Sequence, residues 1–219
     1  MIRTVLDKAL AEAGISLPDK CFPPLEIFAA ELKKWNKKVN LTAICEDNDI
    51  AIKHIVDSLV FAANLTGGES VLDIGSGAGV PAIPLKIANP TVKVVSVDAV
   101  GKKILFQRHI ARLLAFKDFE ALHCRVEKLH ATHAGRFDVI VSRAFSRLEM
   151  FIALASPLLK SGGKIIAMKG PGVHGEFDAV TEEYLRSSGF EISSIRSYSL
   201  PMNKGERTLV TITAVNADQ

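Results

Sequence analysis

The sequence contains little cysteine and few aromatic residues. Three of its 219 residues are cysteine and one is tryptophan. Cys21, Cys45 and Cys124 lie far apart and are odd in number, which argues against a disulfide framework and indicates a reducing compartment, the cytoplasm. The sequence has no C-x-x-C pair or cluster of histidine and cysteine, so we expect no metal site.

Long apolar runs are also missing. No stretch approaches the roughly 18 uninterrupted apolar residues that a membrane span needs. Residues 1–14 alternate charged and apolar side chains at helical spacing, unlike a secretory signal peptide. We therefore expect a protein without a membrane partner.

Charge of neither sign dominates. The chain has 27 Lys and Arg against 24 Asp and Glu, a net charge of +3 and a pI of about 8.7. This excess permits a polyanionic partner but does not establish one. With 48% hydrophobic residues, the chain is long enough for one core of moderate size with a small appendage, and we expect a monomer.

The periodicity of apolar residues changes near residue 70. Before it, apolar residues recur every three or four positions in 5–13, 24–39 and 50–64, which predicts helices. After it, strands and helices alternate. We expect a helical N-terminal extension of residues 1–66 and a core domain of residues 67–219. Gly67 and Gly68 form only a short linker, so the extension is expected to pack on the core.

The core pattern predicts an α/β fold with a seven-stranded, mainly parallel sheet, because strands that alternate with helices pair in parallel. A turn near residues 203–205 separates the last two strands, which we expect to form a hairpin with one antiparallel edge strand. The expected strands are 70–74, 92–98, 119–124, 137–142, 163–169, 189–198 and 207–214. The expected helices between them are 80–88, 101–116, 147–160 and 176–187.

The most informative segment is Val-Leu-Asp-Ile-Gly-Ser-Gly-Ala-Gly, residues 71–79. A short apolar run ends at Asp73 and breaks into Gly75, Gly77 and Gly79, which permit backbone to approach a ligand closely. The next strand ends at Asp98, about 20 positions later, where an acid is placed to accept from ribose hydroxyls. The two strands together predict a nucleoside-binding half of a doubly wound sheet.

The position of the acid distinguishes between nucleoside ligands. A dinucleotide fingerprint would place its third glycine at position 80, which is Val80. The order D-x-G-x-G-x-G instead resembles motif I of the class I S-adenosylmethionine-dependent methyltransferases, in which the acid helps to hold the cationic amino acid end of the ligand. A pyrophosphate would be repelled by Asp73. The simplest alternative is a glycine-rich turn in another α/β protein.

The methyltransferase fold implied by this motif is Rossmann-like, with residues 67–219 as the S-adenosylmethionine-binding domain. Ser142-Arg143-Ala144-Phe145 stands where enzymes acting on exocyclic amines have an Asp/Asn-Pro-Pro-aromatic motif. No cysteine follows Cys124, which disfavours pyrimidine-carbon chemistry. Guanine N7 has a free lone pair and no proton to remove, so its methylation would need no general base, and we predict no certain catalytic residue.

Several further motifs occur in a characteristic order. Trp35-Asn36-Lys37-Lys38-Val39-Asn40-Leu41-Thr42 and His54-Ile55-Val56-Asp57-Ser58 precede the glycines, and Ser142-Arg143-Ala144-Phe145, Lys169-Gly170 and Gly205-Glu206-Arg207 follow them. The order resembles the bacterial 16S ribosomal RNA guanine-N7 methyltransferase G family, also called glucose-inhibited division protein B, over residues 25–213. A departure from the family is Ala78, where relatives often have proline.

This resemblance implies methyl transfer from S-adenosylmethionine to N7 of a guanine in the helix 18 loop of 16S rRNA, on naked RNA or on the small-subunit particle. It carries cofactor contacts to Gly75, Val80, Val126, Glu127 and Arg143, with Asp98 as the ribose-binding acid. With the motif glycines and acid, the expected cofactor-binding residues are Asp73, Gly75, Gly77, Gly79, Val80, Asp98, Val126, Glu127 and Arg143.

An RNA substrate would need cations that neutralise phosphates. Such a basic run is also typical of a solvated helix face. The expected RNA-binding residues are Lys33, Lys34, Lys37, Lys38, Lys102, Lys103, Arg147, Lys169 and Arg207. The alternatives are a methyltransferase acting on a small metabolite or another RNA, and a nucleotide-binding module or NAD oxidoreductase, against which Asp73 and Val80 argue.

Some site residues have structural alternatives. Glu127 would otherwise be a solvated residue that caps a short helix, and Arg143 would pair with Asp73. Phe145 is expected in the core rather than on a base. Trp35 is expected in the core because Leu25, Phe28 and Leu32 share its helical face. His54 and Asp57 lie one turn apart and are expected to hydrogen-bond to each other as part of the scaffold.

Overall fold

Within the described residues, seven strands form one sheet in the order β3-β2-β1-β4-β5-β7-β6. The structure is a computed structural model of the 219-residue chain, and it describes residues 2–143, 145, 147–171 and 179–215. The strands are β1 (Ser70–Ile74), β2 (Lys93–Asp98), β3 (Phe119–His123), β4 (Phe137–Ser142), β5 (Leu159–Lys169), β6 (Phe190–Ser199) and β7 (Glu206–Ala214).

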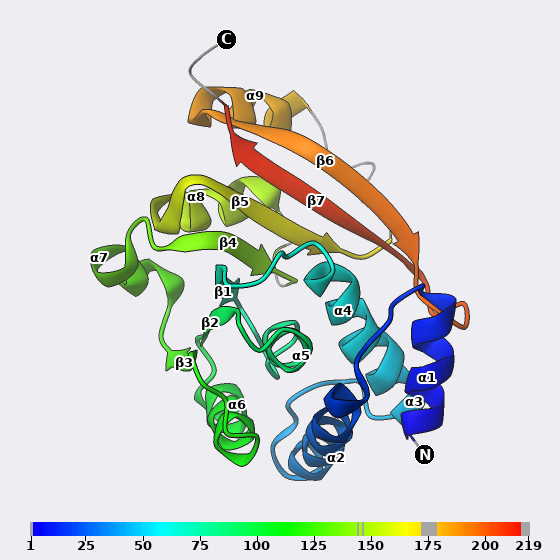
Figure 1. The fold of residues 1–219 in the computed structure, drawn as a ribbon. Helices are drawn as coiled ribbons and strands as arrows, with labels where there is room; N and C mark the ends of the chain where they lie inside the picture. Colours follow the sequence, from blue (N-terminus) through cyan, green and yellow to red (C-terminus); the bar gives the residue numbers. More distant parts are fainter. Residues whose placement is uncertain (1, 144, 146, 172–178, 216–219) are drawn as a thin grey trace.

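Helices precede the sheet and connect its strands (Figure 1). The extension contains α1 (Ile2–Glu12), a 3-10 turn (Asp19–Cys21), α2 (Phe22–Val39), α3 (Asp47–Asp49), a π-helical segment (Ile50–Val56) and α4 (Asp57–Ala62). The core contains α5 (Ala82–Ala88), α6 (Gly101–Leu113), α7 (His130–His133), α8 (Leu148–Ala155), α9 (Ala179–Ser188) and 3-10 turns at Val126–Leu129 and Ser156–Leu158. The expected helix 176–187 begins outside the described residues.

The central strands are apolar on both faces because helices cover both faces. Val71, Val94 and Val139 pack with α4 and α5, whereas Leu72 and Ile140 pack with α8 on the other side. Successive side chains of a strand point to opposite faces, so a strand covered on both sides has a continuous apolar sequence. This arrangement confirms the predicted α/β sheet.

The hairpin of β6 and β7 forms as expected, but the antiparallel strand is not at the edge. β7 pairs antiparallel with both β5 and β6 and therefore lies between them. Leu209, Val210 and Ile212 of β7 are buried, whereas β6 is exposed along most of its length. The more apolar strand takes the interior position, and the prediction of an antiparallel edge strand was wrong.

The N-terminal helices pack directly on the core domain. The rings of Phe28 and Phe106 lie 6.1 Å apart, and the edge of Trp35 meets Phe106 with centroids 5.6 Å apart. Leu6 and Ile52 belong to the same buried cluster as Phe106. These contacts agree with an extension packed on the core, and the division at residue 66 stays a prediction.

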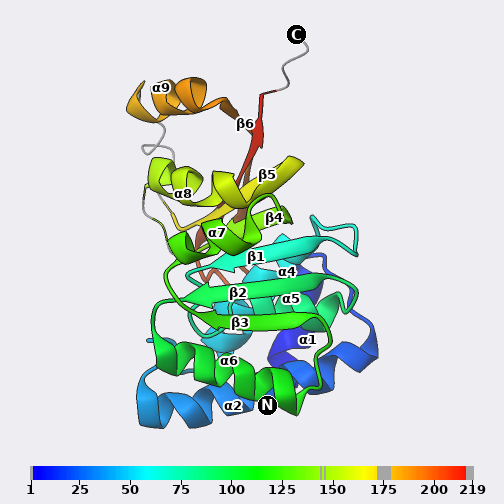
Figure 2. The same ribbon diagram turned by 90° about the vertical axis from the view of Figure 1, so that its left-hand side faces the viewer.

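Figure 2 shows that β1, β2 and β3 point in one direction, so their carboxyl ends form one edge of the sheet. β4 and β5 continue this parallel set, and β7 begins beside the end of β5, where Lys169 pairs with Thr208. In an open α/β sheet, ligands bind outside the carboxyl ends of the strands, where the strand order changes direction. The order changes between β1 and β4, which places the candidate site there.

Candidate functional site at the carboxyl ends of the strands

The glycine loop between β1 and α5 adopts backbone that favours glycine at every second position. Gly75, Gly77 and Gly79 have φ angles of 69°, 57° and 79°. A Cβ on Gly79 would lie 2.4 Å from Ile83 Cδ1, so packing against α5 requires this glycine. A Cβ on Gly77 would meet only the Gly75 carbonyl oxygen, 4.0 Å away. Gly77 therefore leaves open space, as a loop that approaches a ligand must.

Asp98 fixes the loop to the neighbouring strand. Its Oδ2 accepts from the backbone N–H of Gly77 at 2.9 Å, and its Oδ1 accepts from that of Val100 at 2.8 Å. Lys103 Nζ lies 3.9 Å from Oδ2. The side chain is largely buried and its remaining lone pairs lie beside the loop, which suits an acceptor for hydroxyl groups.

A hollow of about 430 Å³ opens beside this acid and receives residues from three strand ends. Val126 forms part of its wall and Glu127, which is exposed, lies at its rim. The residues around it are Ile74, Gly75, Val97, Asp98, Ala99, Cys124, Arg125, Val126 and Glu127. The structure thus brings Gly75, Asp98, Val126 and Glu127 together, as a nucleoside pocket requires.

Asp73 lies beneath the loop and has too few donors. The residue is 1% exposed, and its Oδ2 accepts from the Ala82 backbone N–H at 3.2 Å. Among the described residues, no group donates to the buried Oδ1. Burial raises the pKa of Asp73 to about 7, although the positive charge of Arg143 opposes this. A buried carboxylate oxygen without a donor is where a cationic ligand group would be stabilised.

Sequence reasoning missed Gln107, which holds the loop from the side of α6. Its Nε2 donates to Ser76 Oγ at 2.7 Å and to the Gly77 carbonyl at 2.8 Å, and its Oε1 accepts from Ser96 Oγ at 2.5 Å. Gln107 is fully buried. The available signal was a polar residue on the apolar face of a helix, between Phe106 and Ile110.

Arg143 and His54 bond to residues that the sequence did not suggest as partners. Arg143 Nη2 lies 3.3 Å from Asp57 Oδ2 and donates to the Lys53 carbonyl at 3.2 Å, so it does not form the alternative pair with Asp73. His54 Nε2 lies 3.1 Å from Thr42 Oγ1. The expected bond between His54 and Asp57 is wrong, because the π-helical turn at 50–56 places the two side chains toward different neighbours.

His54 belongs to the scaffold. Burial, assisted by the charge of Arg143, lowers its pKa to about 4. The loop that it contacts is organised by Asn36, whose Oδ1 accepts from the backbone N–H groups of Leu41 and Thr42 at 2.6 Å and 2.9 Å. The Asn36 amide also donates to the Thr42 carbonyl at 2.9 Å. These bonds give the W-N-x-x-x-N-L-T segment a structural purpose.

Val80 and the two aromatic candidates are packed rather than open. Val80 is 8% exposed and belongs to the cluster that includes Phe106. Trp35 packs on Phe106 and His109, with centroids 5.6 Å and 5.2 Å away. Phe145 stacks on Phe151 at 5.2 Å with an interplanar angle of 15°. Both aromatic residues are half-buried and pack against the core clusters.

The expected RNA-binding cations fall into three groups. Lys33 pairs with Asp47 at 2.5 Å and Lys34 with Glu31 at 3.1 Å. Lys169 is only 7% exposed and donates to the Phe145 carbonyl, so it holds the loop after β4 instead of lying on the surface. Arg207 is mostly buried beside Asp57. Lys34, Lys37, Lys38, Lys102 and Arg147 are exposed, Arg147 lies 3.6 Å from Glu149, and Lys103 is half-buried near Asp98.

The exposed lysines gather at the edge that carries the site, because α2 and α6 are antiparallel. Glu31 Oε2 lies 2.7 Å from His109 Nε2, and Trp35, one turn later in α2, meets Phe106, earlier in α6. The end of α2 therefore lies near the start of α6, which follows Asp98 directly. This brings Lys37 and Lys38 to the same edge as Lys102.

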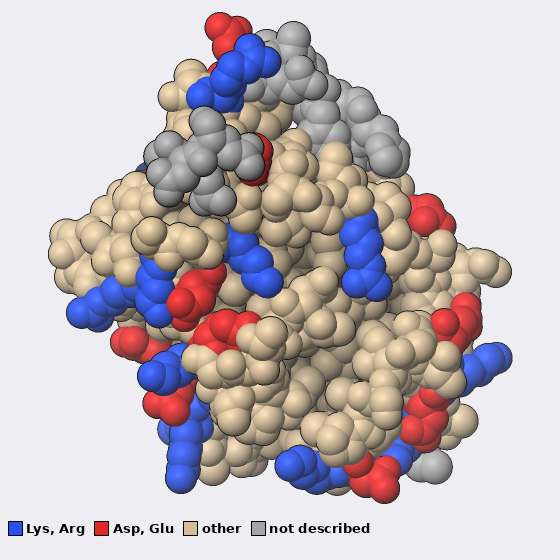
Figure 3. Space-filling view, turned by 45° about the horizontal axis from the view of Figure 1, so that its top comes forward, with Lys and Arg blue, Asp and Glu red and all other residues tan. Residues whose placement is uncertain are grey.

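The opposite edge has a different character. The carboxyl ends of β1–β3, marked by the arrowheads in Figure 2, lie on the side that faces away from the viewer in Figure 1. Figure 3 is seen from the front and top of Figure 1 and therefore shows the side of their amino ends. There Lys and Arg are interspersed with Asp and Glu around a mostly uncharged centre (Figure 3). Such a surface gives no extended field of one sign.

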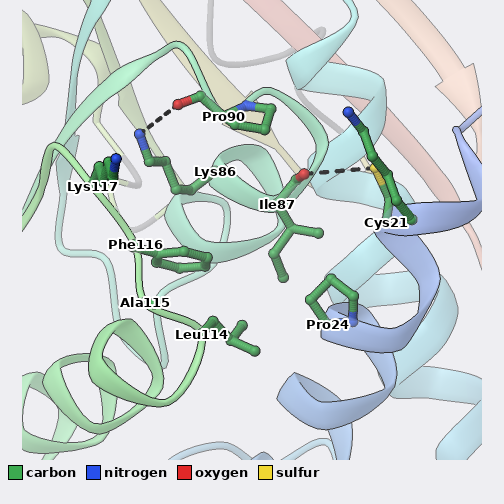
Figure 4. Close-up of a pocket in the computed structure, with 10 residues that line it drawn as sticks. Cys21, Pro24, Lys86, Ile87, Pro90, Leu114, Ala115, Phe116 and Lys117 are labelled. Atoms are coloured by element: carbon green, nitrogen blue, oxygen red, sulfur yellow. Dashed lines mark hydrogen bonds between the residues drawn. The ribbon is translucent and has the colours of Figure 1, made fainter.

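A second hollow, of about 390 Å³, lies at this amino edge. Pro24, Ile87, Leu114 and Phe116 supply apolar walls. Figure 4 shows the ammonium of Lys86 turned toward the Pro90 carbonyl, to which it donates at 2.9 Å. Its lining residues include no carboxylate, and its one buried ammonium is already bonded to backbone. The polar groups that need a ligand are at the other edge.

Known proteins with a similar sequence identify the family. The family model described as rRNA small subunit methyltransferase G matches residues 22–208. The protein named ribosomal RNA small subunit methyltransferase G of Geobacter sulfurreducens is 48% identical over 208 residues, 95% of each chain. Its namesake in Geotalea uraniireducens is 47% identical over 213 residues, 97% of each chain. The chain belongs to the rRNA small subunit methyltransferase G family.

Solved structures share the fold at low sequence identity. A SAM-dependent methyltransferase from Aquifex aeolicus has a TM-score of 0.59 and 16% identity, covering 85% of this chain and 98% of that one. The M. jannaschii protein TYW2 in complex with AdoMet has a TM-score of 0.58 and 13% identity, covering 74% and 76%. These likenesses confirm the fold class. Together with the family they confirm an rRNA methyltransferase that depends on S-adenosylmethionine.

The sequence predicted neither a membrane span nor a metal site. Among the described residues, no helix is long and apolar enough to cross the membrane. The same part of the chain contains no group of three or more His, Cys, Asp or Glu side chains that could hold a metal ion.

Replacing Asp73 with asparagine should remove a pH dependence of stability. The folded pKa of about 7 exceeds the ordinary value of 3.8, so the stabilisation from its bound proton is complete below pH 3.8 and is lost as pH rises through about 7. The unfolding free energy of the wild type should therefore fall relative to Asp73→Asn by roughly 2–4 kcal/mol between pH 4 and 8. Urea denaturation across this range measures the difference.

The same titration contains its own control. His54, with its pKa lowered to about 4, has the opposite effect: its contribution is present above pH 6.5 and is lost as pH falls. Both proteins keep His54, so its effect cancels in the difference. A difference in unfolding free energy that stays constant from pH 4 to 8 would show that Asp73 is charged throughout.

Proposed function

We propose that this family member places a methyl group on N7 of a guanine in the helix 18 loop of 16S rRNA. The observation that carries the proposal is the pairing of the buried, donor-poor Asp73 with the open space above Gly77 and the adjoining hollow. S-adenosylmethionine has a cationic amino acid end, a sulfonium centre and a nucleoside. These parts would lie at Asp73, along the glycine loop and in the hollow. The nucleotide and the atom come from the resemblance of the motif set.

The residues fit this cofactor in an order set by the strands. Asp73 Oδ1 would accept from the ammonium group, and the pKa of this acid, raised by burial, supports a role for a positive charge beside it. Gly75, Gly77 and Gly79 shape the loop. Asp98 would accept from the ribose, and Val126 and Glu127 would flank the base in the hollow. Val80 supports the loop from the core, and Arg143 is assigned to the ligand side at the end of β4.

The reaction needs no proton transfer to or from a protein side chain. S-adenosylmethionine supplies a methyl group on a cationic sulfur, so the new N–C bond forms as the C–S bond breaks. Guanine N7 attacks with a free lone pair, and the positive charge moves to the base. The protein must align the two reactants and exclude water, and no general base is required. The buried position of His54 agrees with this.

Lysines at the carboxyl edge support RNA over a small metabolite. Lys37, Lys38 and Lys102 are exposed there, and Arg147 adds a cation on the loop after β4, with its side chain 66% exposed. RNA phosphates on both sides of a target nucleotide would meet these groups. Lys33, Lys34 and Arg147 are each close to a carboxylate that partly neutralises them, so we assign them a smaller share.

The direct test is methyl transfer to small-subunit particles and to protein-free 16S rRNA from a strain that lacks the gene. Labelled S-adenosylmethionine should give one 7-methylguanine, mapped by borohydride–aniline cleavage to the helix 18 loop. The preferred form of the substrate follows from the two parallel reactions. Label in rRNA without cleavage would contradict N7, and transfer to a small molecule alone would contradict an RNA substrate.

Replacing Gly77 with valine should weaken cofactor binding, because the side chain would enter the open space above the loop. We expect the affinity for S-adenosylhomocysteine to fall about tenfold or more, or at least ~1.4 kcal/mol, by calorimetry. Gly135→Val is a matched control, since Gly135 has a similar φ of 61° and open surroundings but lies before β4. Both variants carry similar backbone strain. Equal loss of affinity in both would contradict this position for the ligand.

The exposed lysines should set the salt dependence of RNA binding. Replacing Lys37, Lys38 and Lys102 by glutamine should reduce the slope of log affinity against log salt by about 2–3. Each phosphate contact releases counterions when RNA binds, so a protein with fewer contacts releases fewer of them. The matched control replaces Lys20, Lys93 and Lys117 at the amino edge, which are also exposed. A larger change in slope for the control would place the RNA on the other edge.

A further inference from the structure

Asp57 is a buried acid that the methyl-transfer chemistry does not use directly. Its side chain is 1% exposed, and it begins α4 in the N-terminal extension. Tyr198 donates its hydroxyl to Asp57 Oδ1 at 2.5 Å. Arg143 Nη2 and Arg207 Nε lie 3.3 Å and 3.8 Å from Oδ2. One carboxylate thus joins the extension to the end of β4, to β6 and to the start of β7.

The π-helical turn before Asp57 gives Arg143 a second acceptor. In an α-helix the Asp57 N–H would bond to the Lys53 carbonyl, four residues earlier. Here it donates to the carbonyls of Ile52 and His54. The Lys53 carbonyl instead accepts from Arg143 Nη2 at 3.2 Å. Single turns of π-helix are frequent at functional sites, and this one presents a carbonyl and a carboxylate to the same guanidinium.

The charge of Arg143 reaches the cofactor acid. The positive charge of Arg143 lowers the pKa of Asp73 and the pKa of His54. The Arg143 side chain is 23% exposed, so part of the guanidinium remains accessible. Its five N–H donors form a rigid fork, and fixing some of them determines where the others point.

The charge balance argues against a purely structural ion pair. Asp57 supplies one negative charge between two guanidinium groups, so the cluster keeps a net positive charge. Burial raises the pKa of Tyr198 far above its ordinary range, and the nearby Asp57 adds to this effect, so Tyr198 adds a donor and no negative charge. The net positive charge of this cluster is explained if one of the two guanidinium groups also faces a bound ligand.

We propose that Asp57 is a positioning residue that, with the Lys53 carbonyl, aims the Arg143 guanidinium at the bound cofactor. The inference rests on the proposed function, because it needs Arg143 on the ligand side. Tyr198 donates to Asp57 Oδ1, and Arg207 lies beside Oδ2 together with Arg143. The extension therefore takes part in cofactor binding without touching the ligand.

A double-mutant cycle tests this coupling. Asp57→Asn keeps the shape of the side chain and removes its charge, and S-adenosylhomocysteine binding is measured by calorimetry in the full-length protein. We expect affinity to fall about tenfold, ~1.4 kcal/mol, in the wild-type background. In the Arg143→Ala background the same substitution should have no further effect, because residues that act through one another are not additive.

Two further variants keep the test decisive. Asp49→Asn is the matched control, since Asp49 also lies in the extension but pairs with Lys53 and Lys204, and it should leave affinity unchanged. Tyr198→Phe removes one hydrogen bond at Asp57 without a change of charge. It should lower affinity about two- to threefold, less than the loss of the charge, and again only while Arg143 is present. Tyr198→Phe replaces Asp57→Asn in the test if a thermal melt shows that Asp57→Asn is not folded.

The outcomes separate the two levels of the proposal. Equal losses with and without Arg143, or wild-type affinity in folded Asp57→Asn, would overturn the positioning role alone. A wild-type protein without affinity for S-adenosylhomocysteine would overturn the proposed function and this inference together. Loss confined to proteins that contain Arg143 would establish the coupling.

Discussion

Three carboxylates buried at one edge of the sheet govern the site, because each needs donors that water does not supply. Asp98 takes backbone N–H groups from the glycine loop and from the start of α6. Asp57 takes two guanidinium groups and a phenol. Asp73 takes one backbone N–H and keeps a bare oxygen. The first two join neighbouring segments, and the third is the acid to which we assign the cationic group of the ligand.

The N-terminal helices contribute to this edge in two ways. Through the π-helical turn they present Asp57 and the Lys53 carbonyl to Arg143, at the end of β4. Through the contact of Trp35 with Phe106 they hold α2 antiparallel to α6, so that lysines from both helices lie at the carboxyl edge of the sheet. Both arrangements depend on packing against the core domain. The extension is therefore packed against the edge at which we propose the site.

Cations at this edge are divided by burial. Arg143, Arg207 and Lys169 are partly or largely buried and bonded to carboxylate or backbone oxygens, where they hold loops and orient one another. Lys37, Lys38 and Lys102 are exposed and free to adapt. Buried guanidinium groups give direction, and exposed ammonium groups give long-range attraction that salt weakens. A methyltransferase acting on a large polyanion needs both.

The sequence alone determined the sheet, its parallel strands, the glycine loop and the two acids Asp73 and Asp98, because these depend on local periodicity, on glycine backbone freedom and on spacing along the chain. Only the tertiary structure decided the position of β7 inside the sheet, the role of Gln107, the burial of Lys169 and the partners of Arg143 and His54. Those outcomes depend on which segments pack together across 11 to 90 residues, from Ser96 and Gln107 to Lys53 and Arg143, and on a π-helical turn that apolar spacing does not reveal.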